Sequence, residues 1–233
     1  MTIFGKRSVD EDEHWITVSD LMSGLMVIFL FIAIAYIRPM LNERNTIRSI
    51  AVTWQQKEVD LVNALHEEFK NDLPRWNAEL DRKTLVIRFN APDVLFAHAS
   101  ADIRPRFEEI LSDFFPRYLR VLGDFKDSIE EVRIEGHTSV DWGGAPPKEA
   151  YFKNMALSQE RTRSVLDYVL NLPDARQHWS WAISHITANG LSSAHPVLDE
   201  SGLEDPERSR RVDFRVRTNA KQEIVRIVET VAE

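Results

Sequence analysis

Residues 15–37 of the chain read WITVSDLMSGLMVIFLFIAIAYI. A helix over these residues would rise about 34 Å at about 1.5 Å per residue, which is enough to cross a hydrocarbon core of about 30 Å. The stretch contains a single carboxylate, Asp20, close to its leading end. The sequence therefore predicts one transmembrane helix that carries an acidic side chain into the membrane.

Asp20 has two interpretations, because aspartate is also a good N-cap and can mark the start of a shorter helix. A helix over residues 21–37 would rise only about 25 Å, which favours the longer one. An exposed aspartate at the bilayer centre costs about 2.5–3.5 kcal/mol, so such residues face protein or a wet cavity and are typical of ion pathways. Asp20 is the candidate ion carrier. Ser19 and Ser23 flank it as pathway candidates, unless their hydroxyls bond back to the helix backbone.

A cleaved secretory signal is a third interpretation of this stretch. Residues 21–32 would form its apolar region, and the small residues Ala33 and Ala35 would mark the cleavage site. The preceding segment opposes it, because four acidic residues at 10–13 follow Lys6 and Arg7. The mass of the mature chain decides this point. Basic residues occur on both sides of the stretch, so charge alone does not fix its orientation.

Composition limits the function. The 233-residue chain has a formal net charge of -8, which argues against a nucleic-acid partner. It has no cysteine, which excludes disulfides and thiolate chemistry. Its seven histidines form no zinc-ligand spacing, and there is no phosphate-binding glycine loop or nucleophile elbow. We therefore expect neither an enzyme, nor a metal site, nor a cofactor, and we interpret His137 as a structural residue that hydrogen-bonds a neighbouring loop.

Residues 38–79 are predicted to be a helical linker. Apolar residues from Ile47 to Phe69 recur at helical spacing, and Pro74 is expected to end the helix beyond Leu73. This amphipathic helix either packs on its own domain or forms a stalk with a second copy. The repeat is interrupted at residues 57–58, and the sequence leaves both alternatives open.

The pattern from Leu80 onward alternates between strands and helices. Period-two apolar residues predict strands at 85–89, 132–135 and 212–216, and a further strand is predicted at 183–188, closed by Gly190. Helices are predicted at 105–122 and 152–170, and a short closing helix at 221–233. The predicted fold class is thus α/β: a βαβαββ sandwich over residues 80–220, preceded by a transmembrane helix at 15–37 and a tail at 1–14.

Polar residues gather after the strand that ends at His137. The strand end carries Thr138, and Asn154, Leu157 and Arg161 share one face of the next helix. A guanidinium with an amide and a hydroxyl nearby suits a ligand carboxylate. Spacing alone favours an ordinary surface, in which Asn154 caps the helix and Arg161 belongs to a solvated row of charges.

Four runs in order, VRIEGHTS, NMALSQERTRSVLDYV, ITANGLSSAHPV and RSRRVDFRV, resemble the OmpA-like peptidoglycan-binding domain over residues 80–218. The resemblance implies that Arg161 holds the carboxylate of diaminopimelate in the peptide stem, with Asn154 and Leu157 beside it. In that family an aspartate follows Thr138 and holds the ammonium, but this chain has Ser139 there. Asp141 is the candidate substitute.

The span joined to such a domain resembles the B subunits of MotA/MotB-type stators, and within them those of the Zorya anti-phage systems. A short acidic tail and the absence of a plug segment favour that branch over the flagellar one. The resemblance implies a homodimer in the inner membrane, inside a ring of a polytopic A-type partner, with a cytoplasmic N-terminus and a periplasmic domain bound to peptidoglycan. The expected ion is H+ rather than Na+, although a carboxylate with nearby hydroxyls serves either. A flagellar stator subunit and a passive membrane-to-wall tether are the alternatives.

Overall fold

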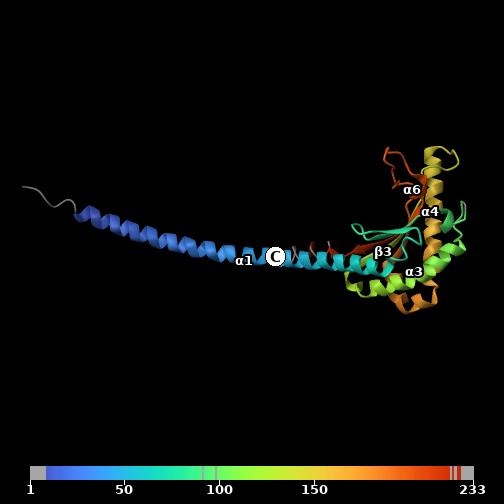
Figure 1. Ribbon diagram of the computed structural model, residues 1–233. Coiled ribbons are helices and arrows are strands. Elements are labelled where there is room, and N and C mark those ends of the chain that lie inside the picture. The colour runs from blue at the N-terminus through green and yellow to red at the C-terminus, as the bar shows by residue number, and fades with distance from the viewer. Residues whose placement is uncertain (1–8, 91, 98, 221, 223–224, 227–233) are drawn as a thin grey trace, which may run out of the picture. The chain divides into compact units, whose positions relative to one another are not determined.

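The computed structural model of the chain describes residues 9–90, 92–97, 99–220, 222 and 225–226 (Figure 1). The chain divides into two compact units, of which the larger is the folded domain Thr53–Glu223. The closing helix predicted at 221–233 lies almost entirely outside the described residues, as does most of the tail predicted at 1–14.

Helix α1 runs from Val9 to Phe69 and contains the apolar stretch. Val18–Arg38 is long and apolar enough to cross a membrane, with a mean hydropathy of 2.3, and none of it is buried inside the protein. Asp20 lies in the interior of this helix, so the interpretation of Asp20 as a helix N-cap is wrong. The longer of the two proposed helices is the one that forms.

The last turns of α1 belong to the folded domain. Leu61, Leu65 and Phe69 recur at every fourth residue and are at most 1% exposed. This part of the helix therefore packs on its own domain rather than serving only as a linker. The helix also ends at Phe69, five residues before Pro74, so that proline does not terminate it. The folded unit begins at Thr53 instead of the predicted Leu80.

The domain contains a five-stranded sheet with the strand order β1-β2-β5-β3-β4. Neighbouring strands are antiparallel except for the parallel pair β3 and β4. The strands are β1 (Ala78–Asp81), β2 (Val86–Phe89), β3 (Ile129–His137), β4 (Ile186–Gly190) and β5 (Arg211–Thr218). The α/β class and the order of the predicted elements are confirmed, with β1 as an additional strand at the start.

Two long helices, α3 (Pro105–Gly123) and α4 (Pro147–Leu170), cover the sheet, and shorter elements connect the rest. These are α2 (Pro92–Leu95), η1 (Lys126–Ser128), η2 (Pro173–His178), α5 (Trp179–His185) and α6 (Pro206–Ser209). The strand predicted at 183–188 is partly wrong, because residues 183–185 continue α5. There the Ser184 hydroxyl donates to the Ser180 carbonyl, and the His185 ring stacks on Trp181.

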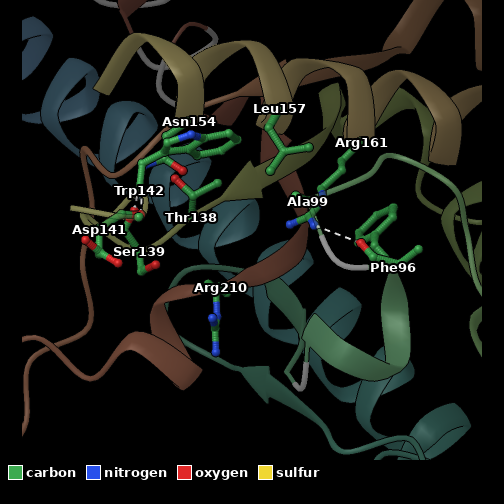
Figure 2. Close-up of a pocket in the computed structure, with 12 residues that line it drawn as sticks. Phe96, Ala99, Thr138, Ser139, Asp141, Trp142, Asn154, Leu157, Arg161 and Arg210 are labelled. Atoms are coloured by element: carbon green, nitrogen blue, oxygen red, sulfur yellow. Dashed lines mark hydrogen bonds between the residues drawn. The ribbon is translucent and has the colours of Figure 1, made fainter. Parts of the chain in front are cut away.

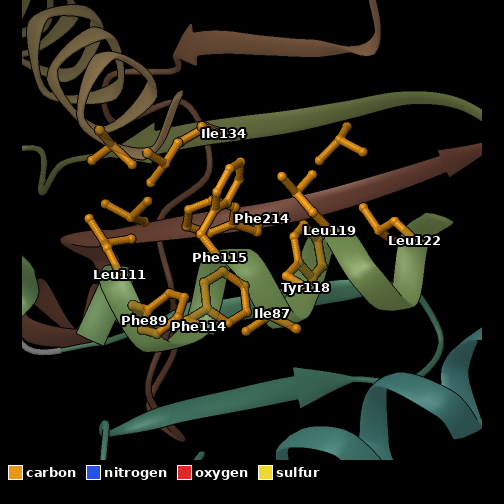
Figure 3. Packing of buried hydrophobic residues seen from close by; sticks show 14 of the residues in the cluster. Ile87, Phe89, Leu111, Phe114, Phe115, Tyr118, Leu119, Leu122, Ile134 and Phe214 are labelled. Carbon is orange, nitrogen blue, oxygen red and sulfur yellow. The ribbon is translucent and has the colours of Figure 1, made fainter. Parts of the chain in front are cut away.

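The core lies between α3 and one face of the sheet (Figure 3). Phe114 stands at its centre, with ring centroids 5.2 Å from Phe69, 5.1 Å from Phe89 and 5.0 Å from Phe214. Because side chains alternate along a strand, the residues next to Phe214 point to the opposite face. Those neighbours are Asp213 and Arg215, which places a polar layer on the far side of the sheet from the core.

Candidate functional site

Asp20, with Ser19 and Ser23 beside it, is exposed on the surface of α1. The Ser23 hydroxyl donates to the Ser19 backbone carbonyl at 2.8 Å. That hydroxyl is therefore engaged in the way serines commonly are inside helices. Asp20 is the carboxylate of the apolar stretch Val18–Arg38, and its role in ion transport stays a prediction.

A cavity of about 320 Å³ lies where β3 ends (Figure 2). All six residues predicted for ligand binding line it: Thr138, Ser139, Asp141, Asn154, Leu157 and Arg161. The first three follow β3 and the others lie along α4. The fold therefore brings the loop after β3 and one face of α4 together at a single cavity, as the family resemblance implies.

Two glycines allow α4 to approach the strand ends that form the cavity. A Cβ on Gly190 would lie 2.4 Å from the Gln159 backbone nitrogen, and one on Gly136 would lie 2.8 Å from the Ser158 carbonyl oxygen. No larger residue fits at either point without moving the helix. Gly136 lies next to the end of β3 at His137. The close packing of α4 on Gly136 therefore fixes the position at which the loop after β3 begins, with Thr138 as its first residue.

Asn154 holds that loop in place. Its amide nitrogen donates to the Ser139 carbonyl at 3.0 Å, with a longer contact to the Asp141 carbonyl at 3.5 Å. The side chain is only 3% exposed. Asn154 lies well inside α4, which begins at Pro147, so the interpretation of Asn154 as a helix cap is wrong. Its amide orients the loop that would face a ligand.

Arg161 is held in one orientation by residues that the sequence analysis did not single out. Its Nε donates to the Ser100 carbonyl at 2.8 Å, and the guanidinium lies over the Phe96 ring, 4.8 Å from the centroid (Figure 2). Arg161 is half-buried and does not belong to a solvated row of charges. A guanidinium fixed in this way loses little freedom when it binds a carboxylate.

The loop after β3 presents Ser139 where the resemblance expects an aspartate. Ser139 is buried, whereas Asp141 is exposed and its carboxylate accepts a bond from the Gly144 amide at 3.4 Å. The Glu204 carboxylate accepts from the Val140 amide at 3.1 Å, which anchors the loop from outside. Asp141, two residues beyond Ser139, thus lines the cavity.

Several cavity residues were missed by the sequence analysis. Phe96 and Ala99 come from the segment between α2 and α3, Trp142 from the loop after β3, and Arg210 from the residue before β5. Arg210 belongs to the run RSRRVDFRV, which the sequence analysis used for the family resemblance. The sequence did not predict that this arginine lines the cavity. The contact between Phe96 and Arg161 joins segments 65 residues apart, which no local pattern reports.

Comparison with known proteins identifies the family. No family model matches the sequence. A relative from Escherichia coli strain Crooks, the Zorya protein ZorB, is 50% identical over 231 residues, which cover 97% of this chain and 98% of the relative. The chain belongs to the ZorB family.

Two solved structures resemble part of this ZorB-family chain. The cell wall anchor of the T6SS from Pseudomonas aeruginosa is 25% identical, over 66% of this chain and 96% of that one, with a TM-score of 0.46. A MotB-like protein from Desulfovibrio vulgaris is 20% identical, over 73% of this chain and 94% of that one, with a TM-score of 0.47.

The ZorB-family domain also contains a buried polar cluster on the neighbouring strands β3 and β5. Glu135, His137 and Asp213 could together offer ligand atoms to a metal. Their two carboxylates are already paired, however: Glu135 with Arg215 at 2.9 Å, and Asp213 with Arg88 at 3.1 Å. Arg211 also pairs with Asp213, at 3.2 Å. Three guanidiniums against two carboxylates leave no excess negative charge for a cation, so we assign the cluster a structural role.

His137 does not make the loop hydrogen bond that the sequence analysis expected. Both ring nitrogens are buried and lack a hydrogen-bond partner among the described residues. The bond to the neighbouring loop comes instead from the Thr138 amide, which donates to the Ser192 carbonyl at 3.0 Å. Burial, reinforced by the guanidinium of Arg211, lowers the pKa of His137 from 6.5 to about 2. The ring is therefore neutral in the folded protein.

This pKa predicts a pH-dependent stability. Below about pH 6.5 the unfolded chain takes up a proton at His137 that the folded chain does not, so stability present above pH 6.5 is lost as the pH falls. The free energy of unfolding should decrease by up to about 1.4 kcal/mol per pH unit from this group. Urea unfolding at pH 7.5 and pH 5.5 measures it. His137→Gln should remove this contribution, whereas His185→Gln, a matched control, should retain it. An unchanged slope in His137→Gln would contradict the assignment.

Proposed function

We propose that this chain is the B subunit of an ion-driven, stator-like motor in the inner membrane, which anchors to peptidoglycan and serves anti-phage defence. Its family membership supports the assignment, since the ZorB relative matches nearly the whole chain. The observation that carries the wall-binding part is the convergence of all six predicted binding residues on one cavity. The ion-coupling part is supported by Asp20, which lies inside the apolar helix.

In the proposed anchor, the cavity binds the diaminopimelate of a peptide stem. Arg161 binds a carboxylate, because its guanidinium is fixed by the Ser100 carbonyl and can offer parallel hydrogen bonds. Asp141 binds the ammonium. The OmpA-like resemblance expects an aspartate at position 139 for this role, but this chain has Ser139 there. The Asn154 amide holds the loop, so that Asp141 and Thr138 stay at the cavity wall.

In the proposed motor, two copies of the chain place their helices inside a ring of a polytopic MotA/ZorA-like subunit. An ionised aspartate is costly in the membrane and a neutral one is not, so each protonation change favours different surroundings for Asp20. The wall anchor supplies the fixed frame, and ion flow becomes rotation of the ring. The N-terminus is then cytoplasmic and the folded domain periplasmic.

A passive tether is the other candidate function. A tether would use Asp20 as no more than the start of a helix, whereas Asp20 lies inside α1. A tether gives no reason for a carboxylate inside an apolar stretch. The motor gives one.

The wall-binding part has a direct test. Arg161→Ala should weaken the pelleting of the purified full-length chain with sacculi about tenfold or more, because a charge-assisted hydrogen-bonded pair is lost. Arg163→Ala is a matched control, since Arg163 lies on the same helix, is exposed, and does not line the cavity. Thermal unfolding checks that both variants fold. Equal pelleting of Arg161→Ala and wild type would show that this cavity is not the wall-binding site.

A further inference from the structure

Ser192 is a fully buried residue with an unusual backbone conformation. It lies two residues beyond the end of β4, and its exposed fraction is 0%. Its φ is +52°, in the left-handed region that favours glycine. A serine is less stable than a glycine in this conformation, because its Cβ crowds the backbone. The side chain of Ser192 therefore needs an explanation.

The hydrogen bonds of Ser192 reach two walls of the cavity. Its carbonyl accepts from the amide of Thr138, at 3.0 Å, on the wall formed by the loop after β3. Its amide donates to the Ser158 hydroxyl at 3.1 Å, and its own hydroxyl donates to the Tyr151 carbonyl at 2.8 Å. Ser158 and Tyr151 belong to α4, which forms another wall. Ser192 itself does not line the cavity.

Only one of these bonds depends on the side chain. A glycine at position 192 would keep the backbone bonds to Thr138 and Ser158, but it would lose the bond from the hydroxyl to Tyr151. Tyr151 lies in the first turns of α4, three residues before Asn154. The hydroxyl of Ser192 therefore holds the start of α4 against the segment that also binds Thr138.

We propose that Ser192 is a positioning residue for ligand binding, which sets the spacing between Thr138 and the start of α4 without touching the ligand. A ligand that contacts both walls binds best when their spacing is already fixed, because ordering them during binding costs free energy. This inference rests on the proposed wall-binding function. It adds a residue outside the cavity on which binding depends.

Two variants separate positioning from a merely structural role. Ser192→Gly removes the hydroxyl but relieves the left-handed backbone, so its thermal unfolding midpoint should stay close to that of wild type. Ser192→Ala removes the same hydroxyl and keeps the unfavourable conformation, so its midpoint should fall. Both variants should weaken the pelleting of the purified full-length chain with sacculi about fivefold, because one neutral hydrogen bond is lost. Affinity then follows the hydroxyl, whereas stability follows the backbone.

Ser201→Gly is the matched control. Ser201 is an exposed loop serine whose hydroxyl donates to the Asp199 carboxylate at 2.6 Å, and it does not line the cavity. This variant also loses a hydroxyl bond in a loop, but it should pellet as wild type does. The fraction bound is measured over a range of sacculi concentrations, at a temperature well below the unfolding midpoint of every variant.

The outcomes separate this inference from the proposed function. Ser192→Gly that pellets as well as wild type overturns the positioning role and leaves wall binding intact. Weaker pelleting confined to Ser192→Ala does the same, because affinity would then follow stability. An equal fall in the unfolding midpoint of both variants also overturns it, since the fold itself would then need the hydroxyl. Wild type that does not pellet with sacculi overturns the proposed wall binding.

Discussion

Asp20→Asn is expected to abolish phage protection while leaving the chain in the membrane at the wild-type level. The amide has nearly the size of the carboxylate and can occupy the same place in α1. It cannot take up and release a proton, so an ion-driven cycle stops completely. Protection is measured as phage plating efficiency in cells that carry the whole system, with membrane levels compared by immunoblot. The efficiency should rise to that of cells without the system.

Two variants control this experiment. Asp20→Glu keeps a carboxylate and should retain part of the protection. Ser23→Ala removes a hydroxyl that is bonded to the Ser19 carbonyl, and it should change protection little. If Asp20→Asn protects as well as wild type at equal expression, the motor mechanism is wrong and the passive tether remains.

A chain that starts at Leu80, the predicted domain start, should not fold, whereas one that starts at Thr53 should. The shorter chain lacks Leu61, Leu65, Phe69 and Trp76, which are at most 6% exposed in the domain. Burial of each such side chain is worth about 1.5–3 kcal/mol, so their sum is comparable to a typical domain stability of about 5–15 kcal/mol. Circular dichroism and thermal unfolding of both chains measure the difference.

A point variant gives the same test without truncation. Phe69 contacts Phe114 in the core and is fully buried, so Phe69→Ala in the longer chain should cost about 3–5 kcal/mol of unfolding free energy. Glu67→Ala is the control, since Glu67 is exposed two residues earlier. Cooperative unfolding of the chain from Leu80, with the midpoint of the longer chain, would show that α1 is not part of the domain.

The fold was predictable where the residue types follow the period of the element. Apolar and polar residues alternate in the sequence of strands β2, β3 and β5, which were found, although both faces of β5 are largely buried. Helix α3 was found as well, because its apolar residues recur at helical spacing. Strand β1 was missed because it is a four-residue edge strand, AELD, whose pattern is too short to recognise. The start of β4 was misplaced because Ile183 is β-branched yet lies on α5.

The cavity was predictable only where its residues are close in the sequence. Asn154, Leu157 and Arg161 share a helix face, and the helical period reveals that arrangement. Phe96 and Arg210 reach the cavity from distant segments, which only the tertiary fold brings together. The role of Asn154 was misjudged for a related reason, since its partner is the carbonyl of Ser139, fifteen residues earlier.

The way in which Asn154 holds the cavity loop separates the shape of the site from its chemistry. The asparagine grips main-chain oxygens at positions 139 and 141, which every amino acid possesses. Substitutions at those two positions can therefore alter the charge offered to a ligand without deforming the scaffold.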